Sequence, residues 1–148
     1  VGAVPLPAQG IVMRSDVPPV VPEAPPGPIR LLVSRTRPPV EASRVAEALA
    51  AELVPMGSAG AKTMAVLPGQ GDIYLLAGGQ YEWDNCAPAR IALSAGFTAT
   101  RLDGAPLEYN RPDPRLPDLL ICPPALAARV HAALSDRAMQ EGLAWDDR

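Results

Sequence analysis

Short apolar runs alternate with helix-like stretches from residue 29 onward, and this alternation most limits what the chain can form. The runs short enough for buried strands are 29–33, 53–56, 72–76, 98–102 and 119–122. The stretches predicted as helices are 40–52, 58–67, 83–95 and one that starts at Pro123-Pro124. Strands that alternate with helices predict an α/β fold, in which helices pack on a sheet. In such layers, binding sites form where loops leave the carboxyl ends of strands.

The N-terminal part has a different pattern. Residues 1–14 read as two short strands around a turn at Gln9-Gly10, and residues 16–28 hold six prolines. Proline removes a ladder donor and fixes φ, so residues 16–28 are predicted to be an extended connection. We therefore expect a strand pair over 1–15, a proline-rich connection over 16–28 and an α/β unit over 29–148. A lone two-stranded hairpin is marginal in water, and its partner is not obvious from the sequence.

Composition limits the classes of function. The 148 residues are 48% hydrophobic and 20% charged, which suits one folded domain or half of a larger one. The net charge of −3 leaves no basic excess to bind a nucleic-acid polymer. No apolar stretch approaches the ~20 residues of a membrane span, and the start lacks the basic region of a signal peptide. Cys86 and Cys122 are too few for a disulfide framework, so we expect free, buried thiols and a cytoplasmic location. The first residue is not Met, so we expect a processed or truncated piece of a longer chain.

The first unusual loop, 57–63, joins a predicted strand to a helix. Ser58 is a plausible N-cap, which places Lys62 in the first helical turn. A cation there costs about 0.3–1 kcal/mol unless an anion joins the site, because the helix macrodipole makes this end positive. Free amides, a glycine and a lysine together can bind an anion. A solvated lysine that tolerates the dipole is the alternative, and the sequence alone leaves both open.

The same loop imitates a phosphate-binding P-loop but lacks its signature. The pattern G-x-x-x-x-G-K-[ST] would need glycines at positions 56 and 61. Met56 and Ala61 stand there instead. The sequence therefore argues against a nucleoside triphosphatase.

The second unusual loop, 77–88, carries paired glycines, two acidic residues and two aromatic residues before a predicted helix. Asp84 is placed to cap that helix, with Pro88 in its first turn, and capping alone would explain the aspartate. One carboxylate oxygen can cap while the other binds a cation, and carboxylate oxygen is a ligand that Mg²⁺ prefers. A single carboxylate cannot hold a hydrolytic metal cluster, so a metal here would need further ligands.

Several spaced motifs resemble one enzyme family. Trp-Asp-Asn-Cys-Ala-Pro at 83–88 is similar to the W-D-x-A-A-G/P signature of the inositol monophosphatase superfamily. The segments 57–96, 101–110 and 116–124 read like its 3′(2′),5′-bisphosphate nucleotidase branch, and the resemblance covers almost the whole chain. The family's other signature, Asp-Pro-(Ile/Leu)-Asp-Gly-Thr, and an upstream glutamate pair do not occur in this sequence. The chain therefore resembles the C-terminal half of such an enzyme.

The resemblance implies a fold and a chemistry. The implied fold is the C-terminal part of a layered α-β-α-β-α sandwich, a mixed sheet flanked by helices, with residues 1–15 belonging to the sheet of the N-terminal half. The implied activity is a Mg²⁺-dependent phosphomonoesterase that removes the 3′-phosphate of 3′-phosphoadenosine 5′-phosphate and is linked to sulfate assimilation. Asp84 is the implied Mg²⁺ ligand, and the implied substrate-binding residues are Gly57, Ser58, Ala59, Lys62 and, by a looser alignment, Ser34 and Arg35. The implied partners are a small phosphorylated nucleotide or sugar-phosphate substrate, the N-terminal half of the same enzyme and a second copy in a homodimer.

Other functions stay open at this point. Inositol phosphate or fructose bisphosphate is an alternative substrate, because the basic residue that some relatives carry after the 72–74 strand is not matched here. A catalytically inactive fragment that keeps anion affinity is a further alternative, since the acidic signature is missing. On the sequence alone, Arg35 is better explained as a surface charge. His131, the only histidine, is predicted to be a solvated residue on the flank of the last helix rather than a catalytic base.

Overall fold

The computed structural model describes the backbone of residues 1–141 and the side chains of residues 1–135. The elements are β1 (Ala3–Leu6), a 3-10 turn (Pro7–Gln9), β2 (Ile11–Arg14), β3 (Arg30–Ser34), α1 (Val40–Leu49), β4 (Glu52–Met56), α2 (Ala59–Val66), β5 (Ile73–Tyr81), α3 (Glu82–Ser94), β6 (Thr98–Thr100), β7 (Arg115–Cys122) and α4 (Pro124–Glu141). The last seven residues of the expected α/β unit lie outside the described residues. None of the helices described is both long and apolar enough to span a membrane.

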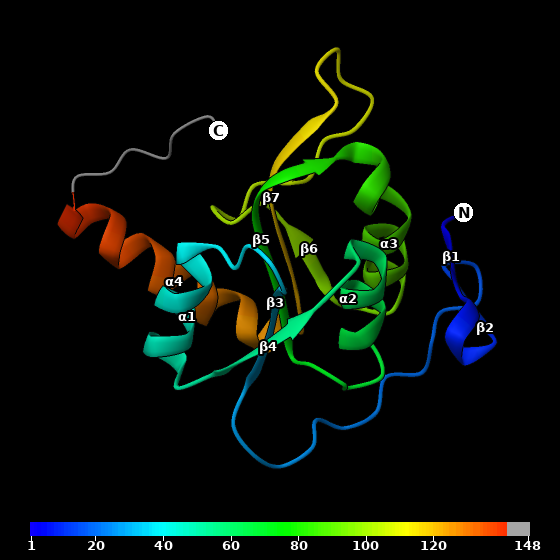
Figure 1. The fold of residues 1–148 in the computed structure, drawn as a ribbon, viewed down its shortest axis with the longest axis horizontal. Coiled ribbons are helices and arrows are strands. Elements are labelled where there is room, and N and C mark those ends of the chain that lie inside the picture. The colour runs from blue at the N-terminus through cyan, green and yellow to red at the C-terminus, as the bar shows by residue number, and fades with distance from the viewer. Residues whose placement is uncertain (142–148) are drawn as a thin grey trace.

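Five strands form one mixed sheet in the order β4-β3-β5-β7-β6. β3 pairs in parallel with β4 and β5, whereas β7 runs antiparallel to both β5 and β6. Helices α1 and α4 lie on one face of the sheet, and α2 and α3 lie on the other (Figure 1). The predicted α/β class and the mixed sheet flanked by helices are confirmed.

The core consists of one apolar layer on each face of the sheet. In β3, Leu32 faces the layer under α2 and α3, while its neighbours Leu31 and Val33 face the layer under α1 and α4. Successive side chains of a strand point to opposite faces, so a strand covered on both faces needs an unbroken apolar run. This requirement explains why the central strands were recognisable in the sequence as short apolar runs.

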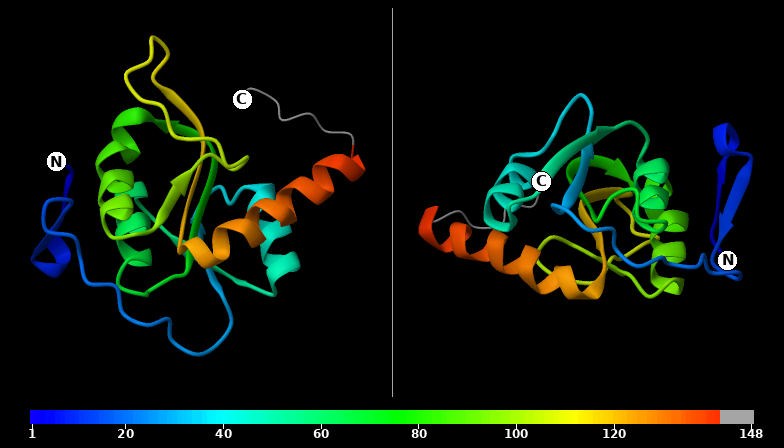
Figure 2. Two further views of the ribbon diagram at one scale, coloured as in Figure 1. Left: turned by 180° about the vertical axis from the view of Figure 1, so that it is seen from behind. Right: turned by 90° about the horizontal axis from the view of Figure 1, so that it is seen from below.

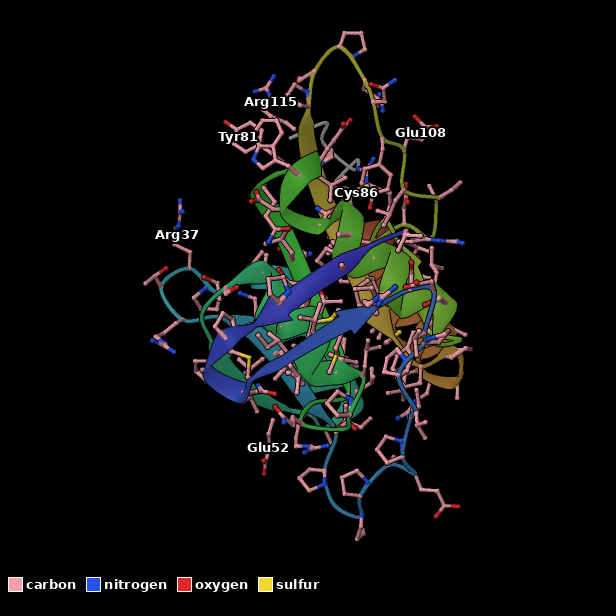
Figure 3. All side chains as sticks on the ribbon, turned by 90° about the vertical axis from the view of Figure 1, so that its right-hand side faces the viewer. Arg37, Glu52, Tyr81, Cys86, Glu108 and Arg115 are labelled. Atoms are coloured by element: carbon pink, nitrogen blue, oxygen red, sulfur yellow. The ribbon has the colours of Figure 1, made fainter. Side chains whose placement is uncertain are left out.

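The N-terminal strands β1 and β2 form a separate antiparallel pair, with Ala3 opposite Arg14. The pair does not join the five-stranded sheet; it lies across the outer face of α2 and α3 (Figures 2 and 3). Val4 packs against the core there, and Gly2 is so close to α3 that an added Cβ would lie 2.8 Å from the carbonyl oxygen of Ala87. The molecule therefore has four layers, in which α2 and α3 lie between the hairpin and the large sheet.

Some element boundaries differ from the predicted ones. β5 continues to Tyr81 instead of ending near residue 76, because Gly78 and Gly79, at φ of 75° and 78°, form a bulge after which pairing with β7 resumes. β7 is correspondingly longer than the predicted strand 119–122. Helix α3 begins at Glu82, so Asp84 is its third residue and not its cap, and Pro88 lies in its second turn. These differences place residues 77–81 in a strand where the sequence predicted a loop.

Candidate active site

The predicted substrate-binding segments lie at the carboxyl ends of the parallel strands β3 and β4. The two strands end in register, because Ser34 pairs with Met56. Arg35 and Gly57 consequently leave the sheet side by side, and a Cβ added to Gly57 would lie 3.8 Å from the Arg35 guanidinium. The Ser34 hydroxyl accepts a hydrogen bond from the Arg37 amide at 3.2 Å, which shapes the turn after β3. The fold thus brings together both segments that the sequence indicated.

Ser58 is the N-cap of α2, as the sequence predicted. Its hydroxyl accepts a hydrogen bond from the Ala61 amide at 3.3 Å, and its carbonyl accepts one from the Lys62 amide at 3.1 Å. Ser58 has φ 63°, which strains a residue with a side chain. The amides of Ala59 and Gly60 have no hydrogen-bond partner among the residues described, so this helix end keeps free donors beside Arg35.

Lys62 is buried beneath this helix end, with only 5% of its surface exposed. Its ammonium group donates to the Met56 carbonyl at 3.2 Å and lies 5.2 Å from the centre of the Tyr74 ring. Burial lowers the pKa of Lys62, and the positive charge of Arg35 lowers it further. The alternative of a solvated lysine is therefore wrong.

The two cations lack a neutralising carboxylate. Among the side chains that the structure describes, none of the acidic groups forms an ion pair with Arg35 or Lys62. A buried positive charge without a counter-ion is unfavourable, so an anionic ligand would stabilise Lys62. Arg35 is exposed, as expected of a surface charge. The anion site predicted around Gly57, Ser58, Ala59 and Lys62 thus has suitable chemistry, and Arg35 stands next to it.

Asp84 lies in the first turn of α3, where it stabilises the helix start. One carboxylate oxygen accepts a hydrogen bond from the Tyr81 amide at 2.9 Å. The other oxygen has no partner among the described residues. The charge of Asp84 contributes, after burial, to raising the pKa of Tyr74 to about 12. Asp84 therefore acts electrostatically on the same ring that supports Lys62.

The described residues contain no cluster of three or more histidine, cysteine or carboxylate side chains that could hold a metal by itself. The nearby acids are occupied, since Glu82 accepts from the amides of Asn110 and Arg111 and Asp113 pairs with Arg115. Mg²⁺ is usually held by one or two protein carboxylates together with waters and substrate phosphates. The free oxygen of Asp84 fits one such ligand, and the remaining protein ligands would have to come from another part of the enzyme.

Further polar and aromatic residues that no sequence motif indicated lie beside Lys62 and Asp84. Tyr74, Gln80 and Asn85 are buried and linked to one another by hydrogen bonds, and the exposed rings of Tyr81 and Trp83 stack with centroids 4.7 Å apart. The sequence predicts Tyr74 in a strand and Asn85 at the start of a helix, and it places Gln80 in a loop because β5 was expected to end near residue 76. No local pattern indicated that the three residues meet.

Three further residues for which expectations came from the sequence, His131, Cys122 and Cys86, are not part of the predicted site. His131 packs against Gly104 and is partly buried, which corrects the prediction of a solvated flank residue. Cys122 is a buried free thiol as predicted, but Cys86 is exposed. Cys86 borders a cavity of about 740 Å³, which is also lined by Val1, Trp83 and Tyr109. None of Arg35, Lys62 and Asp84 lines this cavity.

Solved structures share the fold. The staphylococcal inositol monophosphatase SaIMPase-II superimposes with a TM-score of 0.64 at 15% identity, over 83% of this chain and 49% of that one. CysQ from Bacteroides thetaiotaomicron, a bacterial member of the inositol monophosphatase family, superimposes with a TM-score of 0.58 at 25% identity, over 67% of this chain and 38% of that one.

Relatives found by sequence comparison have a higher sequence identity to this chain than these solved structures have. The 3′-phosphoadenosine 5′-phosphate phosphatase of Mycobacterium bovis is 50% identical over 137 residues, which cover 90% of this chain and 51% of that protein. The chain thus spans about half the length of this curated relative. The model of the inositol monophosphatase family matches residues 29–141, well over half of the chain. With the four-layered fold and the residues at its strand ends, this match shows that the chain belongs to the inositol monophosphatase family.

Proposed function

We propose that this chain is the C-terminal half of a Mg²⁺-dependent phosphatase that removes the 3′-phosphate of 3′-phosphoadenosine 5′-phosphate. The observation that carries the proposal is the buried Lys62, a cation without a carboxylate partner among the described side chains. It follows the carboxyl end of β4, which lies beside the end of β3 where Arg35 leaves the sheet. The relative with 50% identity is named for this activity. The location would be cytoplasmic and the role linked to sulfate assimilation.

Each site residue has a distinct part in this proposal. The amides after Gly57, the Ser58 hydroxyl and the Lys62 ammonium would bind the second phosphate or the ribose of the substrate. Ala59 would offer its free amide to the same group. Ser34 would keep the turn after β3 in place. Arg35 would add a positive charge beside the 57–62 segment.

Asp84 would bind Mg²⁺ through its free carboxylate oxygen. When bound, the metal would supply Lewis-acid stabilisation of the charge that develops on the phosphate and its leaving oxygen. The hydrogen bond from Tyr81 to the second oxygen would fix the carboxylate for this role. Because the described residues offer no metal cluster, the other carboxylates would come from the N-terminal half.

The strand pair 1–15 would join the sheet of that N-terminal half, through the connection 16–28 to the α/β unit 29–148. A two-stranded hairpin packed on two helices leaves strand edges free for further pairing. The complete enzyme would then have five layers, and a homodimer of it would be detected by analytical ultracentrifugation.

The test is a substrate panel on the complete enzyme, in which this chain is preceded by its N-terminal half. We expect phosphate release from 3′-phosphoadenosine 5′-phosphate that requires Mg²⁺ and is faster than release from inositol phosphate or fructose bisphosphate. Preference for either of the last two would replace the proposed substrate. Absence of turnover on all three would remove the proposed activity.

A non-catalytic anion-binding fragment is the second candidate, because the described residues contain no cluster of side chains that could hold a metal by itself. Calorimetry of this chain alone with adenosine 3′,5′-bisphosphate, with and without Mg²⁺, distinguishes the two. Binding without turnover, which persists when the N-terminal half is added, would favour the second candidate.

A further inference from the structure

A chain of four polar side chains runs through the core beneath the site, and the proposed chemistry uses none of them directly. Gln80 donates from Nε2 to the Tyr74 hydroxyl at 2.8 Å, and Asn85 donates from Nδ2 to Gln80 Oε1 at 3.4 Å. Tyr109 donates from its hydroxyl to Asn85 Oδ1 at 3.0 Å. Tyr74, Gln80 and Asn85 are 0%, 9% and 1% exposed, so the bonds among these three residues are shielded from water, while Tyr109 is partly buried.

Two members of this chain, Tyr74 and Asn85, lie beside the two halves of the site. The Tyr74 ring lies under the Lys62 ammonium group. Asn85 follows Asp84 in the sequence, and both residues form hydrogen bonds to the backbone of Tyr81. Asp84 accepts from the Tyr81 amide at 2.9 Å, while Asn85 donates to the Tyr81 carbonyl at 3.5 Å. The start of α3 is thus fixed by the aspartate and by the buried network together.

The network gives the fold little or no stability beyond that of an apolar core of the same shape. A buried amide or hydroxyl destabilises the fold unless it is hydrogen-bonded, whereas replacing both partners by apolar groups is nearly neutral. In this network, however, the side-chain nitrogen and oxygen of both Gln80 and Asn85 are hydrogen-bonded, so each amide has one favoured orientation and the network is rigid. Such rigidity is useful where two ligand groups must keep a fixed separation.

We infer that Tyr74, Gln80, Asn85 and Tyr109 are positioning residues that hold the Asp84 carboxylate in a fixed place relative to the Lys62 ammonium. The inference rests on the proposed function, because it takes Lys62 and Asp84 as the anion-binding and metal-binding groups. The four residues touch neither substrate nor metal and act through Lys62 and Asp84. Tyr109 extends the network to the 101–114 loop.

Two variants that each remove one oxygen test the network in the complete enzyme. Tyr109→Phe removes the hydroxyl that donates a hydrogen bond to Asn85. Tyr74→Phe removes the hydroxyl that accepts a hydrogen bond from Gln80, and it keeps the ring under Lys62. Groups that orient a metal ligand typically change metal affinity about 10–100-fold. We expect each variant to weaken Mg²⁺ binding about 10-fold by calorimetry, near the lower end of this range. The rate at saturating Mg²⁺ and the KM for substrate should change much less for Tyr109→Phe.

The double variant tests whether the two ends are coupled. If the network acts as a unit, the loss of Mg²⁺ affinity in Tyr74→Phe/Tyr109→Phe will be smaller than the product of the single losses. A strictly multiplicative loss would show independent sites and overturn the inference. Unchanged Mg²⁺ affinity in both single variants would overturn it as well.

Asp118→Asn is the matched structural control. Asp118 is also mostly buried and accepts from the Arg101 side chain and the Leu102 amide, so its loss destabilises the same loop. We expect a lower melting temperature with unchanged Mg²⁺ affinity. A weakening of Mg²⁺ binding as large as in Tyr109→Phe would show that the effect is general destabilisation and would reject the network.

A measurement on this chain alone separates failure of the network from failure of the proposed function. In Tyr109→Phe, hydrogen exchange at the Tyr81 amide should speed up more than in Asp118→Asn, because the first turn of α3 loses its support. If the complete enzyme is no phosphatase but this exchange still rises selectively, the proposed function fails and the network stands. If exchange is equal in the two variants, the network itself is rejected.

Discussion

The Lys62 ammonium nitrogen lies 5.2 Å from the centre of the Tyr74 ring, and both residues are buried. The ring face and the Met56 carbonyl partly replace the water that Lys62 loses on burial. They offer no full negative charge. The lysine is therefore held at a position where a bound anion would supply the missing negative charge.

Replacement of Lys62 by methionine should separate stability from anion binding. Lys62→Met keeps the apolar stem and removes a buried charge, so we expect a melting temperature equal to or above that of the parent chain. Binding of adenosine 3′,5′-bisphosphate to the complete enzyme should weaken by about 1.5–3 kcal/mol, or roughly 10–100-fold, which calorimetry measures.

The control for that variant is Arg37→Met, which changes an exposed cation in the neighbouring turn (Figure 3). It should leave binding nearly unchanged. Equal losses in Lys62→Met for ligands with one phosphate and with two would contradict a role in binding the second phosphate.

Two substitutions of Asp84 should separate its structural and chemical parts. Asp84→Asn keeps an oxygen that can accept from the Tyr81 amide, so stability should stay near that of the parent chain. Asp84→Ala loses this bond and should cost about 1 kcal/mol in urea denaturation. Both should abolish Mg²⁺-dependent phosphate release by the complete enzyme. Turnover that survives in Asp84→Asn would exclude the carboxylate as a metal ligand.

The two thiols should differ sharply in reactivity. Cys86 is exposed, while Cys122 is buried and its pKa is raised to about 12 by burial. Because the thiolate is the reactive form, a thiol reagent at pH 8 should modify one cysteine rapidly in the native chain and the second only on unfolding. Cys86→Ser should remove the rapid phase. A rapid phase that persists in this variant would show that Cys122 is accessible.

Burial of Cys122 also predicts a loss of stability at alkaline pH. The folded pKa of about 12 lies above the ordinary value of 9.0, so the thiol stabilises the fold fully below pH 9 and this contribution falls as pH rises towards 12. Tyr74 and Tyr109 act in the same direction, because burial raises the pKa of each phenol. Urea midpoints between pH 8 and 11 should therefore fall, and Cys122→Ala should show a shallower fall than the parent chain.

Gly2 should be intolerant of a side chain. A Cβ in Gly2→Ala would lie 2.8 Å from the Ala87 carbonyl oxygen, so the hairpin must move away from α3. Overpacking of this kind costs about 1–3 kcal/mol, and faster hydrogen exchange in β1 and β2 would detect it. Val1→Ala, at a position that is 96% exposed, is the neutral control. Unchanged exchange in Gly2→Ala would show that the hairpin does not depend on this contact.

Much of the fold was predictable because its signals are local. The apolar runs at Leu31–Val33 and Ile73–Leu75 are buried strands, and Ser58 caps α2 as its position before the helix predicted. The extent of β5 was not predictable, because two glycines that usually mark a turn form a bulge here, and only pairing with β7 decides between the two.

The candidate site, like the fold, was predictable only in those features that depend on neighbouring residues. By itself, the sequence determined that a glycine-rich loop with Lys62 and a helix start with Asp84 follow successive strands, since spacing and turn chemistry are properties of neighbouring residues. Only the tertiary structure decided that Lys62 is buried over Tyr74, that Arg35 stands beside Gly57, and that Gln80, Asn85 and Tyr109 are joined under the site. The physical reason is that burial and hydrogen bonding between residues far apart in the chain depend on how the layers pack, and no local pattern records that packing.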